Sequence, residues 1–440
     1  MKRRILFLFW ALAAAPAVSA GVADTLTLSL AECRRRALAS SEAVGQAALR
    51  ERQADFDRQI ARAAYLPALD ATALGAYMLP DMDMMGMKLR MHGTYMAGLS
   101  LTQPLYAGGR IQAGNRLART GRQVAAEQSR LSRHDVLQDV DQAYYTYVAT
   151  RGKVRVVERH LALADTLCRQ VRTACAAGMA TESDWLRAQA GRSRVRYQLQ
   201  KAEHGALLCR LALCRAIGAG PEAQIIPTDT VFADALADVP TEQTTPAARP
   251  ELRLLELRVD AARHQERMAR ADMLPSVGLQ AGYVWFGGID MTGTAAGTAG
   301  EPVPFKQEIR DGNFVAMLAV KVPLFSWGAN RSKIRKARLD TELAGLELQK
   351  SRRLMQLELQ QARLGVADAA ALIRTARLAL SQATENLRVL QNRYNAAMAP
   401  LSDLLQAQAD WQTAEGDLIE AQAQYKINQT AYLRAAGRLE

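Results

Sequence analysis

One order of sequence motifs occurs twice along the chain, and this duplication limits its possible folds more than any other feature. The segment "ARAAYLP", which starts at Ala61, returns as "ARADMLP", which starts at Ala269. The segment "LSLTQPLYAGG" from Leu99 returns as "LAVKVPLFSWG" from Leu318. Because long internal repeats mark repeated structural units, we expect two copies of one architecture.

A third pair of segments extends the duplication toward the end of each copy. "GMATESDWLRAQA" from Gly178 matches "AMAPLSDLLQAQA" from Ala397, with the same shift along the chain as between Leu99 and Leu318. We therefore divide the chain into a first structural repeat at residues 21–220 and a second at residues 251–440. The proline-containing stretch at residues 221–250 is the predicted connector between them.

Each repeat is predicted to run helix, strand, loop, strand, very long helix, turn and helix. The long helices carry apolar residues at seven-residue spacing, which is typical of left-handed coiled coils. This row is Leu359, Val366, Ile373, Leu380, Leu387 and Tyr394 in the second repeat, and Val140, Tyr147, Val154, Leu161, Cys168 and Cys175 in the first. A helix from Gly109 to Cys175 would be on the order of 100 Å long at about 1.5 Å per residue. An ordinary globular domain does not need a rod of that length.

Before each long helix, the spacing of apolar residues changes from seven to two. In the segment "NFVAMLAVKVPLF" the residues that share one face are Phe314, Ala316, Leu318, Val320 and Val322. Strands of about ten residues with one apolar face suit a membrane β-barrel. Four strands per chain cannot close a barrel by themselves. Either several copies share one barrel, or the strands do not enter a membrane.

The stretch from Met1 to Ala20 is laid out like a secretory signal peptide. A basic start at Lys2 is followed by an apolar run that ends at Ala14 and by small residues up to a cleavage point after Ala20. Beyond this segment there is no run of about 18 apolar residues, so no transmembrane helix is expected. Cleavage removes three of the 56 basic residues and none of the 44 acidic ones, so the mature net charge is 53 − 44 = +9. Because the chain is expected to leave the cytoplasm, nucleic acid is not an expected partner.

The sequence gives no pattern for catalysis or for a disulfide. The five histidines lack HExxH spacing, and no GxSxG, Walker A or GxGxxG segment occurs, so we expect no enzyme activity, no catalytic residue and no cofactor. The odd number of cysteines, five, predicts at least one free thiol. Cys168 and Cys175 occupy the heptad row, where small apolar side chains are buried, and we predict no intrachain disulfide.

Matched motifs in the two repeats carry a family resemblance. A Leu-Pro pair precedes the first strand of each repeat, a Pro-Leu-aromatic segment ends the second strand, and an aspartate lies in the first turn of the last helix. These motifs are Leu66-Pro67, Leu274-Pro275, Pro104-Leu105-Tyr106, Pro323-Leu324-Phe325, Asp184 and Asp403. Together they resemble the TolC family of outer-membrane efflux proteins, over about residues 26–439.

The resemblance implies a mainly α fold with β-structure. Each subunit would have long antiparallel α-helical coiled-coil hairpins plus four membrane β-strands. In a homotrimer the strands would form one twelve-stranded barrel, continued by a periplasmic α-helical tunnel.

The resemblance also implies a function, that of an outer-membrane channel. Such a channel is the exit duct of a tripartite efflux or type I secretion system, in the outer membrane of a Gram-negative bacterium and with a large periplasmic part. Its implied partners are a periplasmic adaptor, an inner-membrane pump and outer-membrane lipid. The alternative is a soluble periplasmic coiled-coil adaptor or scaffold protein, which would explain the signal and the heptads but does not need two pairs of alternating strands.

Seven methionines lie in the segment "MLPDMDMMGMKLRMHGTYM" from Met78 to Met96. The resemblance makes this segment largely the first extracellular loop and residues 287–313 the second. Two interpretations of the methionines stay open. Thioether groups bind soft Cu(I), and methionine also fills apolar space at a barrel rim. The candidate metal ligands are Met82, Met84, Met85 and Met87.

The periplasmic tips of the two helical hairpins are the predicted adaptor contacts, because family members meet their adaptor there. The residues are Met179, Ala180, Met398, Ala399, Pro400 and Leu401. Met179, Met398 and Leu401 are expected to offer exposed apolar contact. The alternative is that the tips are only turns, with Thr181 and Pro400 as helix starters.

The resemblance further implies a periplasmic gate made of polar contacts near the tips. Tyr394 falls on the tyrosine of the family and Asp184 on an aspartate at the constriction. Asp403 matches a motif aspartate one turn before the other constricting position, where Gln406 stands instead of aspartate, and Ala399 replaces the tip arginine. The alternative is that Asp184 and Asp403 only stabilise helix starts, by about 0.3–1 kcal/mol through the helix dipole.

Overall fold

The computed structural model of the chain describes residues 25–79, 81–84, 87–91, 93–228, 248–296 and 302–439. The predicted signal peptide at residues 1–20 lies outside the described residues, as do Met85 and most of the predicted connector. Among the helices within the described ranges, none combines the length and the apolar character needed to cross a membrane.

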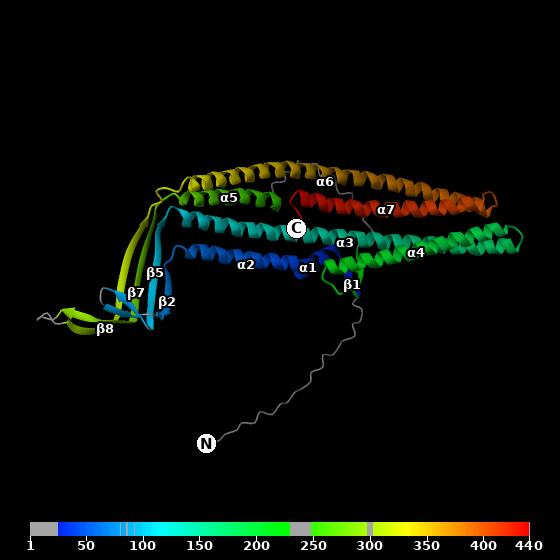
Figure 1. Cartoon of the computed structure of the whole chain (residues 1–440). Coiled ribbons are helices and arrows are strands. Elements are labelled where there is room, and N and C mark those ends of the chain that lie inside the picture. Colours follow the sequence, from blue (N-terminus) through cyan, green and yellow to red (C-terminus); the bar gives the residue numbers. More distant parts are fainter. Residues whose placement is uncertain are drawn as a thin grey trace, which may run out of the picture. The chain divides into compact units, whose positions relative to one another are not determined.

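Six of the described helices form three pairs of equal length, with one member of each pair in each repeat (Figure 1). The pairs are α2 (Glu42–Ala63) and α5 (Pro250–Ala271) with 22 residues each, α3 (Arg110–Ala176) and α6 (Ala329–Asn395) with 67 each, and α4 (Glu182–Ala216) and α7 (Leu401–Ala435) with 35 each. The very long helix followed by a turn and a second helix, predicted in both repeats, is therefore present.

The chain packs as two compact units, each built from segments of both repeats. Within the described residues, the first unit takes residues 25–41, 137–228 and 367–428, and the second takes residues 42–136, 248–366 and 429–439. The first part of α3 and of α6 belongs to the second unit, and the last part of each belongs to the first.

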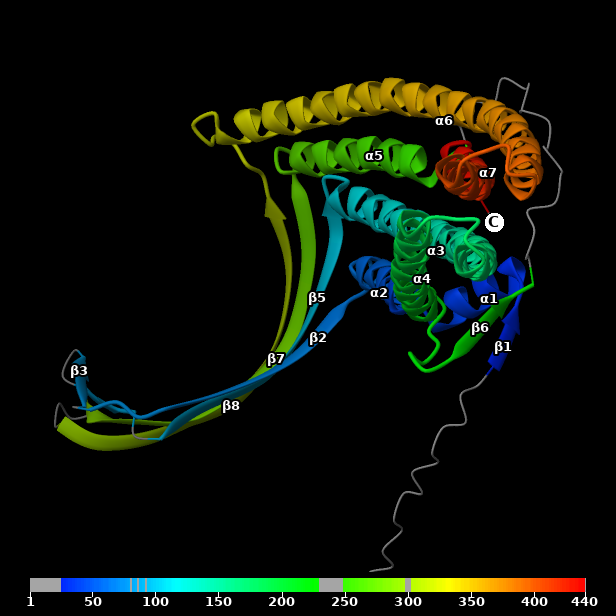
Figure 2. The ribbon, with the colours of Figure 1, turned by 90° about the vertical axis from the view of Figure 1, so that its right-hand side faces the viewer.

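The second unit contains one antiparallel sheet whose four main strands follow the order β2, β5, β7, β8. Its strands are β2 (Ala68–Ala76), β5 (Thr94–Ala107), β7 (Ser276–Ala296) and β8 (Pro302–Lys321). Figure 2 shows these four strands curving together. In register, Leu99 of β5 lies opposite Ala71 of β2 on one side and Tyr283 of β7 on the other. The two strands predicted in each repeat are thus confirmed, and both repeats contribute to one sheet.

The predicted second extracellular loop is wrong in its secondary structure. Residues 287–313 were expected to form a loop, but β7 continues to Ala296 and β8 begins at Pro302. Pairing resumes beyond a bulge between Phe286 and Ile289, and alternating apolar residues such as Ile289, Phe305 and Ile309 continue the hairpin. The methionine-rich segment adds two short strands, β3 (Met82–Met84) and β4 (Met87–Arg90), of which β4 pairs with β7.

The first unit contains a small parallel sheet of β1 (Thr25–Leu28) and β6 (Gln224–Pro227). A buried ion pair also stabilises this unit. Arg34 of α1 (Leu30–Ser40) donates from Nε to Oδ1 of Asp141 at 2.8 Å and from Nη2 to Oδ2 at 2.6 Å. The Asp141 side chain is only 1% exposed. The Tyr147 hydroxyl donates to the carbonyl of Ile225 at 2.9 Å. Both contacts join α3 to elements far away in the sequence.

The heptad rows face inward along the middle of the long helices. Val366 and Ile373 of α6 are buried, as are Val140 and Tyr147 of α3. Tyr394, near the end of α6, is half-buried. All five cysteines are free, so the prediction of no intrachain disulfide is confirmed.

Candidate gate and hairpin tips

The first hairpin tip begins where α3 ends in a left-handed glycine. Gly178 has φ of +73°. The backbone N–H of Met179 donates to the carbonyl of Ala174 at 2.8 Å, and that of Gly178 donates to Cys175 at 3.0 Å. This pair of bonds is the Schellman motif, which satisfies carbonyls at the helix end that would otherwise lack partners.

The second tip has the same hydrogen bonds but an alanine in place of the glycine. The N–H of Met398 donates to the carbonyl of Arg393 at 2.7 Å, and that of Ala397 donates to Tyr394 at 2.9 Å. Ala397 has φ of +57°, a conformation that disfavours residues with a Cβ atom. The turn geometry of the two tips is therefore shared although their sequences differ.

The helices that follow the two tips begin differently. Thr181 caps α4, because its Oγ1 accepts from the N–H of Asp184 at 3.1 Å and the Asp184 carboxylate accepts in return from the N–H of Thr181 at 3.4 Å. This reciprocal capping box stabilises the helix start. At the second tip Pro400 precedes the first residue of α7, and proline has no side-chain acceptor to offer. The alternative interpretation of Thr181 as a helix starter is thus supported at the first tip.

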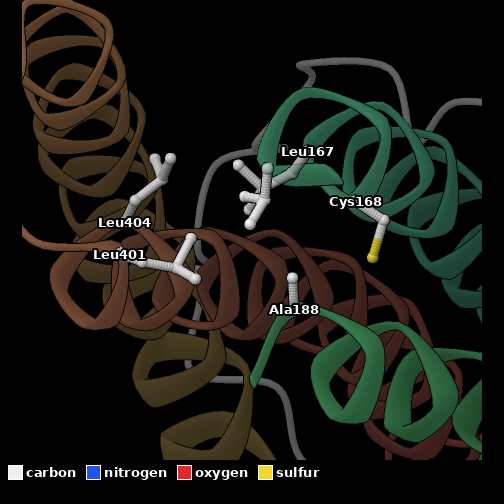
Figure 3. Close-up of a cluster of buried hydrophobic side chains, with 6 residues drawn as sticks. Leu167, Cys168, Ala188, Leu401 and Leu404 are labelled. Carbon is white, nitrogen blue, oxygen red and sulfur yellow. The ribbon is translucent and has the colours of Figure 1, made fainter. Parts of the chain in front are cut away.

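A buried apolar cluster lies directly behind the tips and joins both hairpins (Figure 3). Its members are Leu167, Cys168 and Val171 of α3, Ala188 of α4, and Leu401 and Leu404 of α7. Leu401 is only 4% exposed, so the expectation that it offers exposed apolar contact is wrong. As the first residue of α7 it points into the bundle, because the helix must bury its apolar side from its first turn. Met179 and Met398 are 78% and 71% exposed, as predicted.

Two predicted gate residues from different repeats lie within electrostatic range of each other. Burial raises the pKa of the Tyr394 hydroxyl above its ordinary value, and the negative charge of Asp184 raises it further. The Asp184 side chain is 28% exposed and its Oδ1 lies 3.9 Å from Nη1 of Arg187. The sequence interpretation did not include Arg187, although its position three residues after Asp184 on a helix could have indicated the pair.

The other two gate candidates have local partners on the exposed side of α7. The Asp403 carboxylate accepts from the Ser402 hydroxyl at 3.1 Å. The Gln406 side chain donates from Nε2 to Oδ1 of Asp410 at 2.7 Å. Both Asp403 and Gln406 are exposed in the single chain. One chain therefore brings Asp184 and Tyr394 together and leaves Asp403 and Gln406 on its surface.

The methionine-rich segment is described only in part. Met82 lies in β3 and is 46% exposed, whereas Met85 lies outside the described residues. Within the described ranges, no group of three or more His, Cys, Asp and Glu residues is placed to hold a metal ion. Whether the thioethers bind Cu(I) stays a prediction.

Comparison with known proteins decides the family. The family model described as outer membrane efflux protein matches residues 33–219 and 243–438. The chain belongs to the outer membrane efflux protein family. It is 28% identical to Protein CyaE of Bordetella pertussis, over 97% of this chain and 88% of that protein. It is 24% identical to the outer membrane efflux protein BepC of Brucella suis, over 88% of this chain and 80% of that protein.

The fold agrees with this assignment. The crystal structure of the outer membrane protein VceC of Vibrio cholerae matches with a TM-score of 0.76 and 18% identity, over 93% of this chain and 96% of that one. The predicted resemblance to the TolC family is confirmed. The protein is an outer-membrane efflux channel with a large periplasmic helical part, and the alternative of a soluble adaptor or scaffold is not supported.

Proposed function

We propose that the protein is a homotrimeric exit duct of a tripartite efflux or type I secretion system. Each subunit gives four strands to one twelve-stranded barrel, and the helices continue it as a periplasmic tunnel. Substrates would reach it from an inner-membrane pump and a periplasmic adaptor. Membership of the outer membrane efflux protein family supports the role of an exit duct. The unpaired edges of the sheet support the trimer.

The four main strands of one chain, β2, β5, β7 and β8, leave two open edges. Among the described strands, β2 pairs only with β5 and β8 pairs only with β7. Open edges are not tolerated inside a bilayer, because backbone N–H and C=O groups without partners are costly there. Four strands cannot close on themselves. Pairing of β8 with β2 of the next copy closes the ring when three copies contribute four strands each.

Apolar seams on the helices of the second unit point to the same assembly. On α2 the side chains of Leu49, Phe56 and Ile60 are 59%, 62% and 69% exposed. On α6 a row of leucines is exposed by more than half, namely Leu339, Leu343, Leu346, Leu357 and Leu364. Their spacings of three, four, seven and eleven residues are those of a helix-packing seam. An exposed seam of this length is expected to be covered by another copy.

Cross-linking tests the trimer. In a background without the five native cysteines, Ala71→Cys in β2 and Ala319→Cys in β8 place one thiol on each open edge. A short thiol cross-linker should convert the purified detergent-solubilised protein into dimers and trimers on a denaturing gel. The control pair Ala97→Cys and Trp285→Cys, which lie opposite each other in β5 and β7, should form only links within one chain. A soluble periplasmic monomer, or an edge variant that never forms higher species, would refute the trimer.

The proposed adaptor contacts are Met179, Ala180, Met398, Ala399 and Pro400 at the hairpin tips. The exposure of Met179 and Met398 supports them, and Leu401 is left out because it is buried. Ala180→Arg with Ala399→Arg should abolish export and adaptor cross-linking while the trimer still assembles. Leu401→Ala is the contrast, since it should destabilise the tip before it affects docking. Full export by the double variant would refute these contacts.

The proposed gate uses Asp184 and Tyr394, with Asp403 and Gln406 contributed toward neighbouring subunits. A ring of three Asp184 carboxylates would favour cations and bind multivalent ones, as charged rings in other pores do. Asp184→Asn should weaken cation preference and block in planar bilayers, and Tyr394→Phe should raise conductance if the hydroxyl holds the closed state. Asp417→Asn, at an exposed position farther along α7, is the control. Unchanged selectivity and conductance in both gate variants would leave these residues as helix supports.

A further inference from the structure

The link between β8 and α6 exposes large apolar side chains where the sheet meets the helices. Leu324 and Trp327 are each 90% exposed and Phe325 is 74% exposed. The rings of Phe325 and Trp327 contact each other edge to face, with centroids 4.9 Å apart. This link leaves more apolar surface uncovered than a short connection between buried elements would.

The same region is strongly basic. From Lys321 to Leu339 there are six Lys and Arg residues and no Asp or Glu. The cations are Lys321, Arg331, Lys333, Arg335, Lys336 and Arg338. Of these, only Arg338 has a carboxylate partner among the described residues, Glu266 at 3.8 Å. The first turn of α6 has no acidic residue, so its free N–H groups and helix dipole add to the positive potential.

The position of this region in the fold indicates which kind of partner it binds. The step rests on the proposed function, which places the sheet in the outer membrane and the helices in the periplasm. The end of β8 at Lys321 then lies at the periplasmic membrane surface. Aromatic side chains concentrate at such surfaces, and basic residues there attract anionic lipids.

We propose that the β8–α6 junction, residues 321–338, binds anionic phospholipid headgroups of the periplasmic leaflet. Leu324, Phe325 and Trp327 insert at the boundary between headgroups and acyl chains. Arg331, Lys333, Arg335 and Lys336 bind the phosphates. The site anchors the second repeat of each subunit at a defined depth in the membrane.

The first repeat provides an internal contrast. At its equivalent positions, Leu105 and Tyr106 are 56% and 49% exposed and Gly108 replaces Trp327. Gln112 and Gly114 replace Arg331 and Lys333. The nearest cation, Arg110, is already paired with Asp272 at 2.8 Å. Of the four phosphate-binding cations, the first junction keeps one, Arg116 at the position of Arg335. The two junctions share a backbone path, but the second has larger exposed apolar side chains and a denser positive charge.

Lipid selection by the full-length purified channel tests the proposal. Native mass spectrometry counts the phosphatidylglycerol and phosphatidylethanolamine molecules retained on the protein from an equimolar mixture. Quenching of tryptophan fluorescence by brominated phosphatidylglycerol in vesicles, compared with the Trp327→Phe variant, reports lipid contact at Trp327. Arg331→Gln with Lys333→Gln should lower the preference for phosphatidylglycerol by roughly thirtyfold, as expected for two cations near an anionic surface.

The matched control removes two cations from the same helix. Lys350→Gln with Arg353→Gln lies about 20 residues farther along α6, roughly 30 Å away and beyond the screening length of about 10 Å. This variant should keep the wild-type preference. Equal preference in wild type and in the Arg331/Lys333 variant, or a Trp327 that no brominated lipid quenches because a neighbouring subunit covers it, would overturn the proposal. The mass of the complex distinguishes failure of the lipid site from failure of the proposed trimer. A trimer without lipid preference refutes only this site, whereas a monomer refutes the assembly and the site together.

Discussion

The two hairpin tips reach one turn geometry with different residues. The first uses Gly178 at the left-handed position and a Thr181 capping box, whereas the second uses Ala397 and Pro400. A left-handed alanine costs about 1–2 kcal/mol that glycine avoids. The duplicated architecture thus fixes the backbone, while the stability of each copy can differ. We expect the second tip to open more readily than the first.

The repeats also differ in how they use buried charge. Asp141 of the first repeat is buried and paired with Arg34, whereas the equivalent residue of the second repeat, Gln360, is exposed. The second long helix pairs through an exposed carboxylate instead, Glu358, which lies 2.7 Å from the buried guanidinium of Arg249. The buried carboxylate is thus particular to the first long helix.

Removal of that contact should have the largest effect. Asp141→Ala leaves the Arg34 guanidinium without its carboxylate, and we expect a loss of about 3 kcal/mol, the lower end for a buried ion pair because Arg34 keeps some exposure. This loss of stability is measured by hydrogen exchange of the α1 and α3 amides and by the midpoint temperature at which helix content is lost on heating. Gln360→Ala is the matched control and should change stability by no more than about 0.5 kcal/mol. Similar losses in the two variants would remove the proposed asymmetry.

The fold was predictable where the sequence is periodic. Heptad rows such as Val366 and Ile373 gave the long helices, and alternation around Leu318 gave a strand. The pairing of β1 with β6 and the Arg34–Asp141 contact were not predictable, because they join short or single features far apart in the chain. The extent of β7 and β8 beyond the predicted strands was missed although Val303, Phe305 and Ile309 alternate with polar residues, because the Gly287-Gly288 pair is a turn signal that here lies at a bulge.

The candidate site was predictable only in part. Turn residues and small side chains located both tips, and the exposure of Met179 and Met398 followed from them. The burial of Leu401 was missed because the first residue of a helix has no preceding turn to define its face. The proximity of Asp184 to Tyr394 depends on packing between two repeats, which no local pattern records.

Exchange of the left-handed residues should give opposite effects at the two tips. A Cβ atom at Gly178 would meet no atom within 4 Å, so Gly178→Ala tests backbone strain alone. We expect it to weaken the end of α3 by about 1 kcal/mol, and Ala397→Gly to strengthen the end of α6 by up to about 1 kcal/mol. Local hydrogen exchange measures both changes, because the opening equilibrium constant of an amide changes about tenfold per 1.4 kcal/mol. Two changes of the same sign would show that the tips differ for another reason.

Helix capping should give a smaller contrast. Thr181→Ala removes the side-chain acceptor of the Asp184 N–H and should cost about 1 kcal/mol at the start of α4. Pro400→Ser supplies an acceptor at the start of α7 and should gain only a few tenths of a kcal/mol, because the loss of proline also frees the unfolded chain. The loss at α4 and the gain at α7 are measured by the hydrogen-exchange protection of the first-turn amides of each helix. A gain at α7 as large as the loss at α4 would mean that capping alone separates the tips.

Acidification should give the smallest contrast, through a histidine that only the first repeat has. His160 is 5% exposed and its Nδ1 contacts Oε1 of Gln412, whereas the equivalent residue in the second repeat is Ala379. Burial lowers the pKa of His160 below its ordinary value of 6.5, against a smaller opposing effect of Gln412. The unfolded chain therefore takes up this proton first, so the free energy of unfolding falls as the pH drops through 6.5 toward the lowered pKa and is unaffected above it. Melting curves from about pH 7.5 to about pH 5.5 should show a decline that His160→Gln reduces and that His204→Gln, at an exposed position on α4, leaves intact. A decline of equal size in all three proteins would assign the pH dependence to other groups, such as the buried His134, and not to the first hairpin.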